Sequence, residues 1–119
     1  MAFILGAKFP LLVAVDGGRI VGWCDVAPRD IAGFEHTAGL GMGLLAEARG
    51  RRVGSRLLRS AIARCRERGI EKIELQVLAS NRPARALYRK FGFKQEGRRV
   101  RARKLDGKYD DVVLMGKLL

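Results

Sequence analysis

The stretch EARGRRVGSRLL, residues 47–58, decides how the rest of this chain is interpreted. It places two glycines and four arginines directly before an apolar run. Residues 53–68 carry apolar side chains at helical spacing with arginines on the other side, which predicts an amphipathic helix that ends at Gly69. Three interpretations of the basic stretch are open: a solvated charged face, a contact with nucleic acid, or a cradle for phosphates.

Short runs typical of strands lie on the N-terminal side of this stretch. Residues 11–15 (LLVAV) and 19–26 (RIVGWCDV) flank an Asp-Gly-Gly sequence, which predicts a hairpin. Residues 36–45 predict a third strand, along which Gly39, Gly41 and Gly43 alternate. Glycine weakens a strand unless the backbone bulges there or a backbone-like group comes close. The three alternating glycines therefore indicate one of these two features.

On the C-terminal side, residues 70–78 alternate as a fourth strand. Ser80 or Asn81 can cap a second helix that has Pro83 in its first turn and stops at Gly92. Asp106-Gly107 then marks a second hairpin. The predicted order is therefore ββ-β-α-β-α-ββ, an α/β fold with a mixed sheet and a right-handed βαβ crossover around the first helix.

Length and composition limit the classes of protein that remain. A chain of 119 residues with 48% hydrophobic residues predicts one globular domain, residues 1–119. The net charge of +12 favours an anionic partner without choosing one. The two cysteines lack metal-ligand spacing and are too few for a disulfide framework, which favours a reducing cytoplasm and predicts no metal site. No stretch reads as a signal peptide or a membrane span.

The position of the basic stretch favours the phosphate interpretation. It lies between a predicted strand and the start of a helix, where the first N–H groups have no internal partner and the helix dipole adds positive charge. Gly50 and Gly54 allow a tight turn and a close approach of the backbone to a ligand. Neither the P-loop pattern nor G-x-G-x-x-G is present, so the site is an anion cradle of another kind.

Two motifs together resemble the GNAT superfamily of N-acetyltransferases over nearly the whole chain. The family's pyrophosphate motif, Q/R-x-x-G-x-G/A, corresponds to RGRRVG at residues 49–54. Its later motif, an asparagine followed by a helix with ALY and ending in GF, corresponds to Asn81, residues 86–88 and residues 92–93. The chain departs from the family at Arg52, where glycine is usual. Arginine fits there if its φ is negative, and cofactor affinity is weakened otherwise.

The resemblance implies an acetyl-CoA-dependent N-acetyltransferase that transfers the acetyl group to a primary amine by direct attack in a ternary complex. In the family, the pantetheine amides pair with the open edge of a splayed central strand, which here is the glycine-interrupted strand. The acceptor is left open among small amines, antibiotics, amino acids and protein N-termini. The residues implied in binding acetyl-CoA are Met42, Gly43, Leu44, Arg49, Gly50, Arg51, Arg52, Val53, Gly54, Ser55, Asn81 and Tyr88.

The resemblance also implies catalytic roles. Tyr88 corresponds to the tyrosine that protonates the departing thiolate in many members, although its ring also completes an apolar helix face. The backbone N–H of Leu44 is expected to polarise the thioester carbonyl. Glu35, His36 and Glu47 are the candidates for the general base; Glu35 is the expected one, and His36 is expected to be structural or exposed. Asn81 either contacts pantetheine or caps its helix.

A non-catalytic module of the same fold that binds nucleic acid or an acidic protein is the alternative function. Residues 97–104 (GRRVRARK) form a basic strand, but aromatic residues do not interleave it, so nucleic acid is not the expected partner. Family members usually begin with a strand and one or two helices that precede the hairpin. In this chain, residues 2–10 provide at most the end of such a helix. An open sheet edge of this kind recruits other chains, so a homodimer is expected.

Overall fold

One seven-stranded sheet forms the framework of the computed structural model, which describes residues 2–5 and 11–119. The strand order across the sheet is β1-β2-β3-β4-β5-β7-β6. The elements along the chain are β1 (Ala2–Leu5), β2 (Leu11–Asp16), β3 (Arg19–Pro28), β4 (Thr37–Leu44), the 3-10 helix η1 (Ala46–Ala48), α1 (Val53–Glu67), β5 (Lys72–Leu78), α2 (Arg82–Lys90), β6 (Lys94–Leu105) and β7 (Lys108–Leu118).

The predicted mixed α/β sheet is confirmed. Neighbouring strands are antiparallel except β4 and β5, which are parallel and are connected through α1. Both predicted hairpins are present, one at Gly17 and Gly18 and one at Asp106 and Gly107, and all four residues adopt a positive φ as tight turns require.

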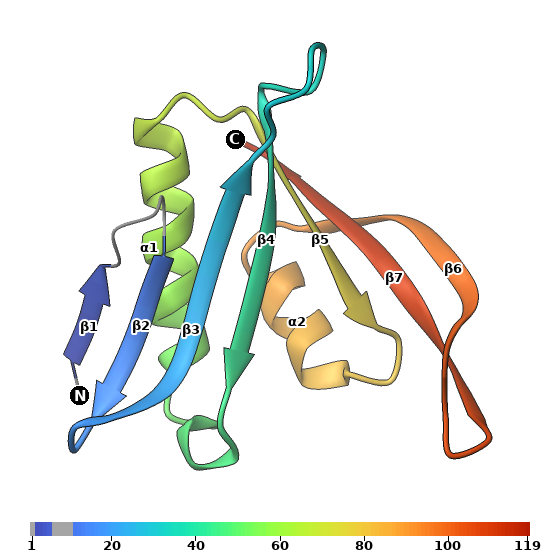
Figure 1. Cartoon of the computed structure of the whole chain (residues 1–119), viewed down its shortest axis with the longest axis horizontal. Helices are drawn as coiled ribbons and strands as arrows, with labels where there is room; N and C mark the ends of the chain where they lie inside the picture. Colours follow the sequence, from blue (N-terminus) through green and yellow to red (C-terminus); the bar gives the residue numbers. More distant parts are fainter. Residues whose placement is uncertain (1, 6–10) are drawn as a thin grey trace.

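Both helices lie on the same face of the sheet, behind it in Figure 1, and among the described residues no helix covers the other face. The apolar stripe of α1 supplies Leu57, Leu58 and Ala61 to the core, and each of them is fully buried. Removing a buried leucine side chain of this kind costs about 2–5 kcal/mol, so this stripe fixes α1 against β2 and β3.

The expectation for the N-terminus was wrong where the structure describes it. Residues 2–5 are not the end of a helix. They form β1, which pairs antiparallel with β2 from Ala2 opposite Val15 to Leu5 opposite Leu12. A strand is the more favourable outcome because the free edge of β2 offers a ladder of backbone partners. Residues 6–10 of the predicted segment lie outside the described residues.

The two parallel strands in the middle of the sheet separate soon after they begin. β4 pairs with β5 only at Thr37, Ala38 and Gly39, whereas both strands run on for several residues beyond this point. Figure 1 shows the resulting V between β4 and β5, with α2 behind it. The residues around this opening form the candidate active site.

Candidate active site

The edge of β4 that faces the opening presents unpaired backbone groups. The N–H of Leu45 donates to the carbonyl of Val21 at 2.8 Å, so Leu45 faces β3. Because residues along a strand face alternate neighbours, Leu44 and Met42 direct their N–H and C=O groups away from β3 and into the opening. The structure therefore supports Met42 and Leu44 as candidate partners of an extended ligand.

The same alternation corrects the assignment of Gly43. Gly43 pairs with Trp23 in the register of β3 and β4 and shares the orientation of Leu45, so its backbone groups are directed toward β3. It cannot offer them to a ligand in the opening.

The alternating glycines of β4 have a different role from the one expected. A Cβ built on Gly43 would lie 2.6 Å from Nε1 of Trp23, and one built on Gly41 would lie 2.8 Å from Oδ1 of Asp25. Separations below 3.0 Å do not occur for real Cβ atoms. The glycines thus make room for two side chains of β3 to lie against β4, on the face opposite the helices.

The loop before α1 has the backbone geometry that the predicted anion site requires. Gly50 adopts φ 74°, which glycine accommodates without strain. The N–H of Arg56 donates to the carbonyl of Arg52 at 3.1 Å as the first bond of α1. The N–H groups of Val53, Gly54 and Ser55 precede it and have no intrahelical partner, so they are available to an anion at the positive end of the helix dipole.

Arg52 does not meet the condition set from the sequence. It is the N-cap of α1 with φ 60° and ψ 18°, the left-handed region, and its side chain makes no capping hydrogen bond. The positive φ is the conformation for which the family's glycine is suited. Arg51 is oriented by an ion pair of 2.9 Å with Asp16 at the β2–β3 turn, which ties the loop to the hairpin. Arg49 is extended, with φ −69°.

The missing side chain of Gly54 serves packing. A Cβ at this position would lie 3.0 Å from Leu87 of α2, 3.0 Å from Met42 and 3.3 Å from Leu44. The absence of a side chain lets the first turn of α1 sit against β4 and α2 together. This contact places the free N–H groups of α1 beside the open edge of β4.

Tyr88 lies on α2, whose start is capped as predicted. The side chain of Asn81 accepts a hydrogen bond of 3.2 Å from the N–H of Ala84, so the capping interpretation of Asn81 agrees with the structure. Tyr88 is only 7% exposed, and its ring packs edge-on against Phe93 at 5.7 Å between centroids. Packing is therefore one role of Tyr88 in the structure.

Burial governs the ionisation of three groups in this region. It raises the pKa of Tyr88 to about 12, with the nearby Cys24 as the smaller cause. It also raises the pKa of Cys24 to about 12, followed by the charges of Asp25 and Cys65, and the pKa of Cys65 to about 11. Tyr88 thus keeps its proton at neutral pH and is a donor rather than a base, and both thiols remain protonated and inert.

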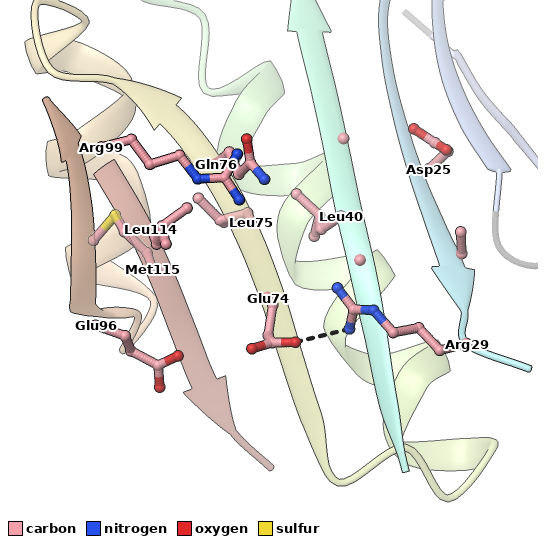
Figure 2. Close-up of a pocket in the computed structure, with 13 residues that line it drawn as sticks. Asp25, Arg29, Leu40, Glu74, Leu75, Gln76, Glu96, Arg99, Leu114 and Met115 are labelled. Atoms are coloured by element: carbon pink, nitrogen blue, oxygen red, sulfur yellow. Dashed lines mark ion pairs between the residues drawn. The ribbon is translucent and has the colours of Figure 1, made fainter. Parts of the chain in front are cut away.

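A groove of about 700 Å³ opens at the place where β4 and β5 part. Figure 2 shows Leu40 and Leu75 near its middle, with charged side chains around them. Arg29 pairs with Glu74 at 2.8 Å, and Glu96 pairs with Lys72 at 2.9 Å. The remaining lining residues are Asp25, Ala27, Gly39, Gly41, Gln76, Arg99, Leu114 and Met115.

The structure does not bring Glu35 to this groove. Glu35 is exposed in the turn before β4, nine residues from Leu44. With about 3.3 Å per residue, the length of the strand separates Glu35 from the N–H of Leu44. The assignment of Glu35 as general base is therefore corrected. His36 acts through its backbone, because its carbonyl accepts hydrogen bonds from Glu71 and Lys72 at 2.8 and 3.2 Å.

Sequence reasoning missed Asp25 as a residue of the groove. The alternation of β3 predicts that Asp25 shares a face with Trp23, but not which strand lies beside it. The only sequence signal for this placement is that one strand carries two large side chains at alternate positions and another strand carries glycines at alternate positions.

The basic strand β6 is partly neutralised by β7. Arg98 pairs with Asp111 at 2.6 Å, and Arg103 lies 3.7 Å from Asp110. The N–H of Arg101 also donates to Asp111 at 2.7 Å, and this bond, followed by Arg98, lowers the pKa of the Asp111 carboxyl. These contacts stabilise a bulge in β6 between Arg99 and Arg103.

None of the helices in residues 2–5 and 11–119 is both long and apolar enough to cross a membrane. Within the same residues, His, Cys, Asp and Glu side chains form no group of three or more that could hold a metal ion.

Comparison with known proteins identifies the family. Residues 3–93 match the model of the acetyltransferase (GNAT) family, and the chain belongs to this family. A Bacillus subtilis protein named as an alanine N-acetyltransferase of ribosomal protein bS18 is 35% identical over 87 residues, which are 72% of this chain and 54% of that protein. An L-amino acid N-acetyltransferase of Escherichia coli is 31% identical over 90% of this chain and 67% of its own length.

A solved structure shares the fold. The phosphinothricin acetyltransferase of Sinorhizobium meliloti in complex with acetyl-CoA has a TM-score of 0.85 and 26% identity. The match covers 93% of this chain and 61% of that chain. The chain thus spans about half the length of the Bacillus relative and about two thirds of the Escherichia relative.

Proposed function

We propose that this chain transfers the acetyl group of acetyl-CoA to a primary amine by direct attack in a ternary complex. The observation that carries the proposal is the open edge of β4, at Met42 and Leu44, placed directly beside the free N–H groups at the start of α1. The extended pantetheine arm of acetyl-CoA carries amides that fit the open edge of β4. The phosphates at its other end fit the free N–H groups of α1. Membership of the GNAT family supports the same activity.

The residues of the chain divide into binding and catalytic groups under this proposal. Acetyl-CoA supplies an activated acetyl group. Met42 and Leu44 pair with pantetheine amides as an added strand would, and the loop that ends in Gly54 and Ser55 binds the phosphates. Arg49 and Arg51 add positive charge to that loop.

The transfer itself forms one bond and breaks another. As the amine nitrogen bonds to the acetyl carbon and the carbon–sulfur bond breaks, Leu44 donates its backbone N–H to the carbonyl oxygen, where negative charge develops. Tyr88, whose phenol is protonated at neutral pH, gives its proton to the departing thiolate and afterwards recovers a proton from solvent. The amine releases its surplus proton to solvent.

The acceptor class is a primary amine. Relatives are named for acetylation of a protein alanine and of L-amino acids, which supports this class without choosing a member of it. The protonated buried thiols are consistent with a reducing cytoplasm. We also propose a homodimer, and light scattering at micromolar concentration tests it.

The test is binding followed by turnover. Acetyl-CoA at 100 times its dissociation constant is expected to stabilise the fold by about 2.7 kcal/mol, seen as a higher melting temperature. S-acetylpantetheine, which lacks the phosphates, is the control and is expected to give a smaller shift. An acceptor panel with thiol detection then identifies the amine. The absence of a shift at millimolar acetyl-CoA, together with salt-dependent retention on nucleic acid, would favour the non-catalytic alternative instead.

A further inference from the structure

Two side chains of β3 lie over glycines of β4, and one of them, Asp25, lines the groove. Trp23 and Asp25 stand two residues apart, so both project from the face of the sheet opposite the helices. Trp23 pairs with Gly43 and Asp25 with Gly41 in the register of the two strands. Neither side chain could lie in this place if β4 carried a Cβ at those glycines.

Asp25 is placed at the point where the sheet opens. The last paired residue of β4 on the β5 side is Gly39, and Gly41 follows two residues later on the same face. The carboxylate of Asp25 lies over Gly41, as shown by the 2.8 Å between its Oδ1 and a Cβ built there. Figure 2 shows Asp25 on the β3 side of β4, across that strand from Leu75 and Gln76.

The charge of Asp25 is not used by the fold. Of the charged residues that line the groove, Arg29 is bound to Glu74, and Glu96 is bound to Lys72. Within the described part of the chain, the side chain of Asp25 forms no ion pair or hydrogen bond, and the cation Arg99 lies on the opposite side of the groove. A half-buried carboxylate without a partner, aimed at a groove, is suited to a cation from outside.

We propose that Asp25 binds the ammonium group of the acceptor amine, with Trp23 as the neighbouring aromatic wall and the glycines of β4 as the floor. The role of this amine as the acetyl acceptor rests on the proposed function, whereas its binding to Asp25 does not. A carboxylate accepts charge-assisted hydrogen bonds from an ammonium group, and an indole attracts the same group through its π face.

The overall charge makes such a residue necessary. A protein of net charge +12 repels a cationic acceptor at long range. A local carboxylate that is free of internal partners offsets this repulsion beside the opening between β4 and β5. Substrate specificity then depends on a positive amine next to an apolar or aromatic group.

The single tryptophan makes the site directly observable. Trp23 is the only tryptophan in the chain, so its fluorescence reports on this corner alone. The experiment titrates phenethylamine and L-leucinamide into the protein, with and without saturating coenzyme A, and uses the neutral analogue 2-phenylethanol for comparison. Calorimetry with coenzyme A on every variant measures the cofactor site separately.

Two variants test the assignment, and a third is the control. Asp25→Asn keeps the shape and removes the charge, and it is expected to weaken amine binding at least tenfold while coenzyme A affinity stays within twofold. Gly41→Ala keeps the charge but displaces the carboxylate, so it is expected to weaken amine binding as well. Asp30→Asn, an exposed aspartate outside the groove, is expected to bind amines as the unaltered chain does.

The outcomes separate this inference from the proposed function. Amine-dependent quenching that is lost in Asp25→Asn supports the inference, even if coenzyme A fails to bind and the proposed function falls. Equal binding of phenethylamine and 2-phenylethanol, an unchanged affinity in Asp25→Asn, or no response to either amine would overturn it.

Discussion

Replacing Arg52 by glycine is expected to stabilise the fold although it removes a complete side chain. Arg52 holds φ 60° and ψ 18° at the start of α1 and makes no capping hydrogen bond with its side chain. The left-handed region costs a residue with a Cβ about 1–2 kcal/mol. Glycine adopts it without that cost.

The gain in folding stability is reduced because glycine has more conformational freedom than arginine in the unfolded chain. A glycine in place of another residue lowers stability by about 0.4–1 kcal/mol for this reason. The net effect of Arg52→Gly is therefore a gain of about 0.5–1 kcal/mol, from the difference between strain relief and lost rigidity. In a domain of this size, that gain raises the melting temperature by about 2–5 °C.

Thermal and urea unfolding measure the effect, and Arg49→Gly is the matched control. It makes the same chemical change three residues away at an ordinary φ of −69°. Without strain to relieve, Arg49→Gly is expected to lose about 0.4–1 kcal/mol. Loss of stability in Arg52→Gly equal to that in Arg49→Gly would refute the reasoning, because it would show that the left-handed backbone carries no cost at position 52.

The same variant addresses the departure from the family motif. Arg52→Gly restores the glycine of the motif, so acetyl-CoA affinity is expected to be kept or improved on titration calorimetry. A tenfold weaker affinity would show instead that the guanidinium of Arg52 is a phosphate ligand.

The remaining predictions concern buried groups. Tyr88→Phe is expected to lower turnover while cofactor affinity stays within a few-fold, and unchanged turnover would leave Tyr88 with packing alone. Because burial raises the pKa of Tyr88 from 10 to about 12, its contribution to stability is complete below pH 10 and is lost as the pH rises through about 12. An absorbance titration should therefore show an ionisation near pH 12 that Tyr88→Phe lacks. Gly54→Ala is expected to lower the melting temperature, since its Cβ would lie 3.0 Å from both Leu87 and Met42. Cys24 and Cys65, with pKa values of about 12 and 11, should react with thiol reagents at pH 8 only after unfolding, and rapid labelling of the native protein would contradict their burial.

Local patterns in the sequence determined the elements and the identity of the family. The helical period of residues 53–68 predicted α1, found at Val53–Glu67, because a buried stripe has to repeat at the helical period. The Asp-Gly turns fixed both hairpins, and Asn81 predicted the cap of α2. The two motifs at residues 49–54 and 81–93 were sufficient to indicate the GNAT family, which the family model confirms.

Only the tertiary structure decided how these elements work together. Residues 2–5 carry too little pattern to choose between helix and strand, and the free edge of β2 decided in favour of a strand. Glycine spacing showed that something approaches β4, but only the register with β3 identified Trp23 and Asp25. Glu35 directly precedes the predicted strand that contains Leu44, yet the rise of an extended chain separates the two residues. Sequence patterns record which face a side chain takes, whereas the neighbour on that face depends on pairing between strands distant in the chain.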